Sequence, residues 1–274
     1  MAQKIVLLHD RGLISVTGPE APKFLQDLIT TDIDGLAINQ AAYAGLLTPQ
    51  GKILFDFFVI REERGYLIDC LLEQREQLIK RLMFYKLRAK LDIAPDGRQV
   101  AAVLAGAVEG AIADPRAVGM GARLYAAPGE TDGTLGDYHR QRILQGLAEG
   151  GQDYASGQLF PHEANFDQIG ALSFRKGCFV GQEVISRIEH RGTARSRILP
   201  CRAEGKLPAK GSEVNAGSMI VGTVFSGMGD RLLALLRLDR LEEAHRDNFS
   251  VMAGGSRLLP MKAPWAGYDV PAFD

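Results

Sequence analysis

The spacing of apolar residues divides the first 195 residues into short runs and longer amphipathic segments. In residues 73–90, Leu78, Leu82 and Tyr85 recur at i, i+4 and i+7, which predicts a helix with one buried face. Short apolar runs bounded by turn residues predict strands, and Arg11-Gly12 between two of them predicts a hairpin. The predicted strands span 5–8, 13–16, 41–47, 53–60, 66–71 and 100–104, and the other predicted helices span 21–29 and 138–147.

The pattern changes beyond residue 195, where short strands alternate with turns that contain glycine. Strands of this length and spacing are typical of a small antiparallel barrel. We therefore expect an α+β protein with a body over residues 1–195 and a C-terminal antiparallel β-barrel over residues 196–274. The predicted barrel strands span 198–202, 219–225, 232–238 and 258–262.

The predicted helix over residues 73–90 is strongly basic, although the whole chain has a formal charge of −1. One interpretation is a solvated face whose long side chains also cover apolar surface. The other is an anion site for a folate glutamate tail, for nucleic acid or for an acidic partner protein. The near-neutral whole chain argues against a general affinity for nucleic acid or anionic membranes. The basic residues of this segment are Arg75, Lys80, Arg81, Lys86, Arg88 and Lys90.

The cysteines and the N-terminus indicate a compartment. Cys70, Cys178 and Cys201 are odd in number and far apart, which argues against a disulfide framework and against a self-contained Cys-x-x-Cys metal site. The N-terminus leads directly into a predicted strand and lacks the apolar core of a secretory signal. No apolar run approaches the roughly 20 residues that span a bilayer. We expect a cytoplasmic protein that works in reducing conditions and away from membranes.

The segment around Cys178 carries the strongest chemical signal. Arg175 and Lys176 precede the thiol, and Gly181 precedes a predicted helix that ends at Gly192. Cations and a helix N-terminus both favour a thiolate, which attacks electrophiles and binds soft metals. The alternative is a small buried cysteine in a tight turn between Gly177 and Gly181.

The eight residues from Lys176 to Glu183 resemble the signature of the YgfZ family, whose members are related to the glycine-cleavage T-protein. Residues 46–56, 85–90 and 160–166, together with Arg187, extend this similarity. The resemblance implies a T-protein-like body of two interleaved α+β halves around a central opening, followed by a C-terminal barrel. It also implies an accessory role in the maturation or repair of iron–sulfur proteins, in particular of 4Fe–4S enzymes.

The resemblance assigns roles within the motif. Cys178 is expected to be the working residue, either as a cluster ligand shared with a partner or as a transient nucleophile. Lys176 and Arg175 are expected to favour its thiolate, Gly177 and Gly181 to permit the turn, and Gln182 and Glu183 to fix the helix and line the opening. Arg187 either pairs with Glu183 or forms an anion cradle beside the thiol. Because a cluster normally needs four ligands, the others must come from an iron–sulfur carrier, a client protein, a second copy or small thiols.

Tetrahydrofolate is the ligand that the T-protein relationship suggests. The residues that match folate-contacting positions of the relatives are Asp56, Tyr85, Arg88 and Lys90. Two departures argue against it: Phe55 replaces the first of two adjacent carboxylates, and Leu144 replaces an acid that holds the pterin. Unpaired pterin donors would cost about 1–3 kcal/mol each on binding. A folate-dependent aminomethyltransferase and a folate-sensing regulatory protein nevertheless remain the alternative functions.

Overall fold

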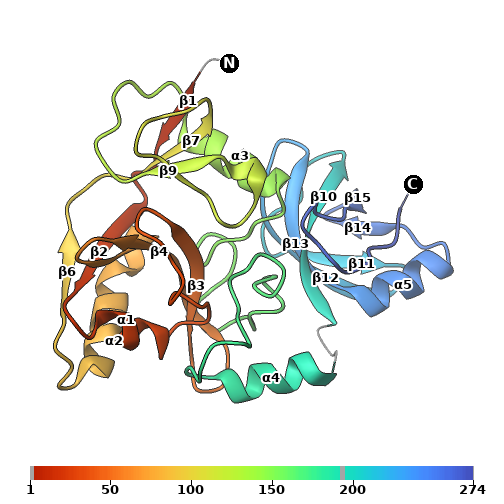
Figure 1. Cartoon of the computed structure of the whole chain (residues 1–274). Coiled ribbons are helices and arrows are strands. Elements are labelled where there is room, and N and C mark those ends of the chain that lie inside the picture. The colour runs from red at the N-terminus through yellow and green to blue at the C-terminus, as the bar shows by residue number, and fades with distance from the viewer. Residues whose placement is uncertain (1–2, 192–194, 274) are drawn as a thin grey trace.

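The computed structural model describes residues 3–191 and 195–273 and contains two open sheets and a closed barrel (Figure 1). The five-stranded sheet has the order β3-β4-β5-β2-β6, with every neighbouring pair antiparallel. Two helices, α1 and α2, cover one of its faces. Apolar residues of the helices, such as Leu82, form a core with sheet residues such as Ile14 and Phe57. These elements are β2 (Arg11–Thr17), α1 (Ala21–Gln26), β3 (Ala41–Leu47), β4 (Ile53–Glu62), β5 (Gly65–Leu71), α2 (Arg75–Lys86) and β6 (Asp92–Asp96).

The second sheet has four strands in the order β1-β7-β9-β8 and packs against α3. Thr134 caps α3, and its side chain exchanges hydrogen bonds with Asp137 in a capping box. The elements are β1 (Lys4–Leu7), β7 (Ala101–Ala105), β8 (Ile112–Ala113), β9 (Ala122–Leu124) and α3 (Leu135–Leu144).

The hairpin predicted around Arg11-Gly12 is wrong. Strand β1 pairs with β7 in the second sheet, whereas β2 pairs with β5 and β6 in the first. The chain therefore passes from the second sheet to the first between β1 and β2. Strand β1 pairs with a strand roughly a hundred residues away in sequence. This crossing interleaves the two halves of the body, as the family resemblance implied.

The six C-terminal strands close into an antiparallel barrel in the order β10-β13-β12-β11-β14-β15, which confirms the predicted fold class. Two of these strands, β11 and β14, and the helix α5 were not predicted, because they are short or highly charged. The elements are β10 (Ser196–Glu204), β11 (Glu213–Ala216), β12 (Met219–Met228), β13 (Arg231–Arg237), α5 (Leu238–Arg246), β14 (Val251–Ala253) and β15 (Ser256–Pro260).

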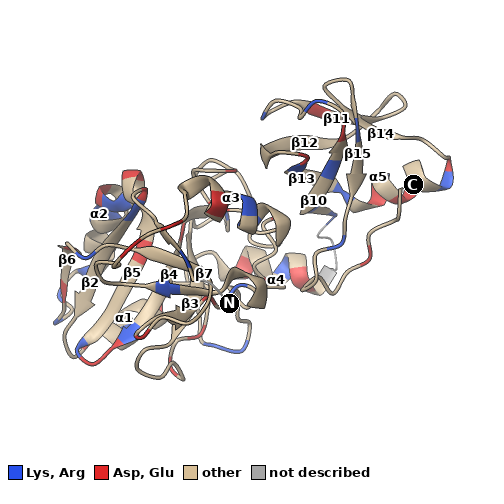
Figure 2. Cartoon of the chain, turned by 90° about the horizontal axis from the view of Figure 1, so that it is seen from above, with Lys and Arg blue, Asp and Glu red and all other residues tan. Residues whose placement is uncertain are grey.

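Helix ends differ from those predicted. Helix α2 ends at Lys86 rather than at residue 90, because Leu87 adopts a left-handed backbone conformation with φ of 47°. Helix α4 (Gln182–Arg191) begins as predicted, and its predicted stop at Gly192 lies outside the described residues. Seen from above, α4 lies between the sheets and the barrel (Figure 2). No helix among the described residues combines the length and apolarity that crossing a membrane requires.

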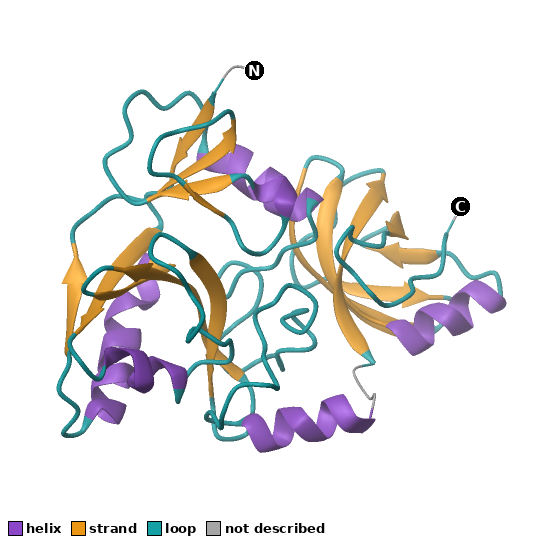
Figure 3. Cartoon of the chain, in the orientation of Figure 1, coloured by secondary structure: helices purple, strands orange, loops and turns teal. Residues whose placement is uncertain are grey.

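A long irregular segment, residues 145–181, connects α3 to α4 and occupies the middle of the molecule (Figure 3). This segment lacks the regular backbone hydrogen bonds of a helix or sheet, and turns and buried polar side chains stabilise it instead. Asn165, for example, donates a hydrogen bond from Nδ2 to the carbonyl of Ile198 at 2.8 Å. Residues 160–166, which resemble the family, lie within this segment, and the motif from Lys176 to Glu183 spans its end and the start of α4. The limits proposed for the two domains, at residues 195 and 196, remain a prediction.

Candidate functional site

The thiol of Cys178 lies in the loop before α4 and is exposed. Cys70 on β5 and Cys201 on β10 are buried. Burial raises the pKa of the Cys70 thiol to about 12 and also raises the pKa of Cys201. Among the three cysteines, all of them described, only Cys178 can therefore reach another molecule without unfolding.

A groove of about 630 Å³ runs beside Cys178, between the tip of the β3–β4 hairpin and one side of α4. Its apolar contributions come from Pro49, Phe179, Val180 and Val184, and His190 lies at its far end. The predicted site residues that line the groove are Cys178, Gly181, Gln182, Glu183 and Arg187. The structure therefore brings together five of the seven predicted motif residues.

Two glycines allow α4 to start against the β3–β4 turn. Gly181 has φ of 81°, and a Cβ there would lie 2.6 Å from the carbonyl oxygen of Thr48. Gly51 has φ of 79° and packs against Val184 and Ile185. Both positions exclude a side chain through conformation and contact together.

The other glycine of the motif differs. A Cβ at Gly177 would meet no heavy atom of the described residues within 4 Å, apart from its chain neighbours, and Gly177 does not adopt a left-handed conformation. The turn therefore does not require glycine at this position, which corrects the role predicted for Gly177. Gln182 does stabilise the helix start, because its side-chain oxygen accepts the N–H of Phe179 at 3.1 Å.

Lys176 is buried, and its ammonium is bonded to backbone carbonyls. Its ammonium donates hydrogen bonds to the carbonyl oxygens of Gln26, Ile29 and Thr31, the last two at 2.6 and 3.0 Å. Burial lowers the pKa of Lys176 to about 8, against the opposing effect of nearby carboxylates such as Asp32. The lysine therefore ties the Cys178 loop to the end of α1. Among the described residues, no hydrogen bond or ion pair joins its ammonium to Cys178.

Glu183 and Arg187 form an ion pair one turn apart on α4, and both side chains are exposed. A pair of this kind contributes roughly 0.3–0.5 kcal/mol to helix stability. The structure therefore favours plain helix stabilisation over the anion cradle proposed for Arg187.

His162, Asp167 and Glu189 place three possible metal-ligand atoms within 4.8 Å of one another. His162 Nε2 lies 2.9 Å from Glu189 on α4, and the buried Nδ1 has no hydrogen-bond partner among the residues that the structure describes. Asp167 is already engaged by both Nη atoms of Arg197 on β10, at 2.5 and 2.9 Å. Because a guanidinium cation occupies this cluster, it functions as a polar joint between the irregular segment, α4 and the barrel.

The residues predicted for folate are not brought together. Asp56 is buried and accepts hydrogen bonds from Tyr43, Tyr154 and the N–H of Gly150. Burial raises the pKa of the Asp56 carboxyl, and these three donors oppose the rise. Tyr85 is half-buried against the α2 core, whereas Arg88 and Lys90 are exposed beyond the end of α2.

The two departures from T-protein also have a structural meaning. Phe55 is buried in the apolar core beneath α2, on the opposite side of β4 from Asp56, so the two residues do alternate in direction. Leu144 is 44% exposed at the end of α3. These residues do not fit a pterin, because neither position offers a hydrogen-bond acceptor and Asp56 has its own internal donors.

Sequence reasoning missed a buried ionic network where the two sheets, α3 and the irregular segment meet. Asp69 accepts hydrogen bonds from Arg11 and Arg123, both at 2.7 Å. Arg116 bonds Glu149 at 2.7 Å, and burial of Glu149 is outweighed by the arginines, which hold its pKa well below the usual range. The members are Arg11, Asp69, Asp114, Arg116, Arg123, Tyr138, Arg142, Glu149 and Asp153.

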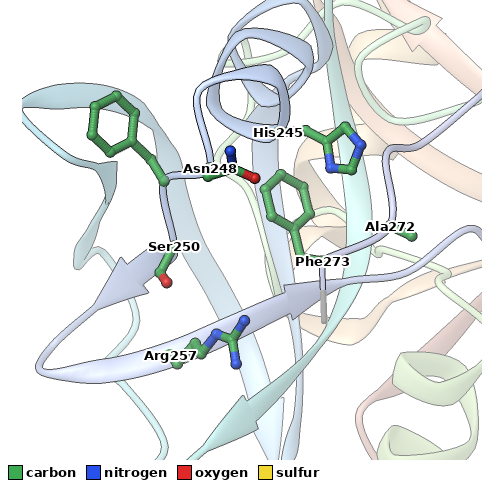
Figure 4. A pocket seen from close by; sticks show the side chains of 7 residues that line it. His245, Asn248, Ser250, Arg257, Ala272 and Phe273 are labelled. Atoms are coloured by element: carbon green, nitrogen blue, oxygen red, sulfur yellow. The ribbon is translucent and has the colours of Figure 1, made fainter.

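A separate pocket lies on the barrel, between the end of α5 and the C-terminal residues (Figure 4). The ring of Phe273 meets that of His245 edge-on, with 5.8 Å between centroids, and Arg257 lies on the adjoining strand. The pocket contains no residue of the Cys178 motif and shares no element with it.

Comparison with known proteins agrees with this architecture. The solved glycine cleavage system aminomethyltransferase T from Bartonella henselae superimposes with a TM-score of 0.77 over 96% of this chain and 86% of that one. At 16% identity, this likeness shows the fold alone. Residues 195–268 match the family described as the CAF17 C-terminal beta-barrel domain.

Sequence relatives decide the family. Over 276 residues the chain is 33% identical to the human mitochondrial iron–sulfur cluster assembly factor IBA57, covering 86% of this chain and 78% of the relative. The chain belongs to the YgfZ/IBA57 family. The Neurospora crassa homologue is also 33% identical, over 74% of this chain and 56% of its own length.

The names of these relatives overturn one expectation. They are called mitochondrial, which points away from the cytoplasmic location predicted from the N-terminus. That prediction rested on the lack of a secretory signal, which bears on export but does not distinguish among internal compartments.

Proposed function

We propose that this protein acts in the maturation of iron–sulfur proteins by holding a cluster jointly with a partner, through Cys178. Family membership supports the process, because the relatives are named iron–sulfur cluster assembly factors. The observation that carries the role of the residue is its exposure: Cys178 opens into a groove, whereas Cys70 and Cys201 are buried.

A single thiolate leaves most of a cluster's coordination unsatisfied, since iron–sulfur clusters are normally held by four ligands. Cys70 and Cys201 lie in different sheets and cannot reach Cys178 without breaking strand pairing. The remaining ligands therefore come from an iron–sulfur carrier of the A type or from the client protein. The cluster is cargo in this scheme, and no resident cofactor is required.

Folate-dependent transfer is the weaker candidate. Phe55, Leu144 and the internally bonded Asp56 give a pterin no free acceptor, and the buried arginines at the meeting point of the sheets are neutralised by their own carboxylates. We therefore propose that neither folate chemistry nor folate sensing is the function of this chain.

Genetic complementation tests the proposal. Cells that lack their own family member should regain activity of a 4Fe–4S enzyme when they receive the wild-type gene. The Cys178→Ser variant should restore none, although it accumulates to the same level. The matched control is Arg202→Gln on the exposed surface of the barrel, which should restore activity. Full restoration by Cys178→Ser would remove Cys178 from the mechanism.

A further inference from the structure

The outward face of α2 combines cations with exposed apolar side chains. Gln77, Lys80, Arg81 and Phe84 follow i, i+3, i+4 and i+7 spacing and lie on one stripe, opposite the buried Leu78 and Leu82. Figure 2 shows basic and acidic positions on this helix, and the acidic ones lie before residue 77. Between residues 77 and 90 the chain contains five basic residues and no acidic one.

These groups are free to meet another molecule. Phe84 is 69% exposed, Leu87 87% and Met83 47%. Among the described residues, no carboxylate pairs with Lys80 or Arg81, whose positions are also exposed. If the basic side chains lay flat over apolar surface, Phe84 would be covered, so the interpretation as a plain solvated helix face does not account for the structure.

A groove of about 420 Å³ opens at the same face, where α2 meets the start of β4. Leu54, Phe55 and Phe84 contribute apolar surface, and Lys80 and Arg81 lie at its edge. Aromatic, methionine and arginine side chains are enriched at protein interfaces, with charges placed around an apolar centre.

We propose that this α2 face, formed by Lys80, Arg81, Phe84, Leu87 and Arg88, docks the partner protein through an acidic surface with an apolar centre. The inference rests on the proposed function and specifies where the partner that shares the cluster binds. Charge complementarity selects the partner, because Lys80, Arg81 and Arg88 attract an acidic surface and steer its approach. The apolar contacts of Phe84 and Leu87 then hold it.

The face lies within reach of the thiol. Pro49 lines the Cys178 groove and Leu54 lines the α2 groove, and both belong to the β3–β4 hairpin. Five residues of extended chain span at most about 18 Å. A standard interface covers about 800 Å² on each partner, a patch roughly 30 Å across. The two grooves are therefore separated by less than the width of one standard interface.

A protein partner fits better than nucleic acid. Phosphate contacts would use the cations, and Phe84 could stack on a base, but Leu87 and Met83 would gain little from either. A protein with an apolar centre uses all of these side chains.

The test measures binding of an apo A-type iron–sulfur carrier at about 50 and about 300 mM salt, where electrostatic attraction differs strongly. The Lys80→Glu/Arg81→Glu variant should bind at least tenfold more weakly at low salt, and the loss should shrink at high salt. Phe84→Ala should weaken binding at both salt concentrations. The matched control, Arg202→Glu/Lys206→Glu on the exposed surface of the barrel, should bind as wild type does.

The outcomes separate the two proposals. Cys178→Ser should bind the apo carrier as wild type does and form no cluster-bearing complex. If the α2 variants bind and form that complex normally, the docking inference is wrong while the role of Cys178 stands. If the wild-type protein binds no carrier, the docking inference is wrong, while complementation with Cys178→Ser still decides the role of that residue. If a single-stranded RNA 12-mer binds in an α2-dependent way and the carrier does not, the partner class is wrong.

Discussion

Reactive side chains in this protein differ sharply in their exposure to solvent. Cys178 and Cys70 are chemically identical, yet burial raises the pKa of Cys70 to about 12, whereas Cys178 is exposed and lines a groove. Lys176 stands two residues before the exposed thiol, but its ammonium is bonded to three backbone carbonyls. Neighbours in sequence therefore do not share a role.

Alkylation should report this difference directly. In the native protein at neutral pH, iodoacetamide should modify Cys178 and leave Cys70 and Cys201 unmodified, because only an accessible thiolate reacts. Peptide mass spectrometry identifies the modified residue, and all three should react after denaturation. Native modification of Cys70 at an equal rate would contradict the burial on which the argument depends.

Lys176 should give stability a defined pH dependence. Its pKa is about 8 in the folded state against 10.5 for an ordinary lysine, so the unfolded state binds more protons between these values. The free energy of unfolding that Lys176 contributes should therefore rise as pH increases from about 8 to 10.5. It should be lower below pH 8, where both states are protonated.

Urea unfolding of the wild type and Lys176→Met at pH 7 and at pH 9.5 tests this dependence. The variant should be less stable by about 1–3 kcal/mol because buried carbonyls lose their donor. The difference in the free energy of unfolding between the wild type and the variant should be larger at pH 9.5 than at pH 7. A smaller difference at pH 9.5 would mean that the folded state holds the proton more tightly than the unfolded state.

At the scale of elements, the contact between the β3–β4 turn and α4 positions the site. The sequence allowed the start of α4 and the turn glycine Gly181 to be predicted, since both signals are local. The sheet switch between β1 and β2 could not be predicted, because the pairing of β1 with β7 depends on contacts distant in sequence. The end of α2 was also missed, because Leu87 is no helix breaker by type.

Two alanine substitutions in the motif should behave differently. Gly181→Ala forces Cβ to within 2.6 Å of a backbone oxygen in a left-handed conformation, and we expect destabilisation of about 2 kcal/mol or more. Gly177→Ala meets no atom within 4 Å and should change stability by less than about 0.5 kcal/mol. Thermal unfolding measures the stability of both variants. Equal losses of stability would contradict the conclusion that the turn requires glycine at position 181 and not at position 177.

At the scale of the whole molecule, the fold class and the barrel were predictable, and the buried ionic network was not. Strand spacing and a family motif are readable along the chain, whereas Arg11, Asp69 and Arg123 come from three distant segments. Each is an ordinary charged residue in the sequence. Only the packing of two sheets against α3 makes them a unit, and breaking one buried pair costs about 3–5 kcal/mol.

A titration with folate tests whether the body of the protein contains a pterin-binding site. Calorimetric titration with tetrahydrofolate should show no submicromolar binding. Introducing Phe55→Asp and Leu144→Glu together should not create it, since Phe55 faces the core beneath α2 and Leu144 faces solvent. The variant should instead lose stability through a buried carboxylate. Tight binding by the unmodified protein would restore a one-carbon function.

The most direct test of the central claim is absorption spectroscopy, with native mass spectrometry, of the protein mixed anaerobically with a cluster-loaded A-type carrier. The isolated protein should be colourless, because one exposed thiolate supplies too few soft ligands. The mixture should yield a coloured complex that contains both proteins and one cluster, and Cys178→Ser should yield none. A brown monomer that depends on Cys70 or Cys201, or an equal complex with Cys178→Ser, would contradict the account.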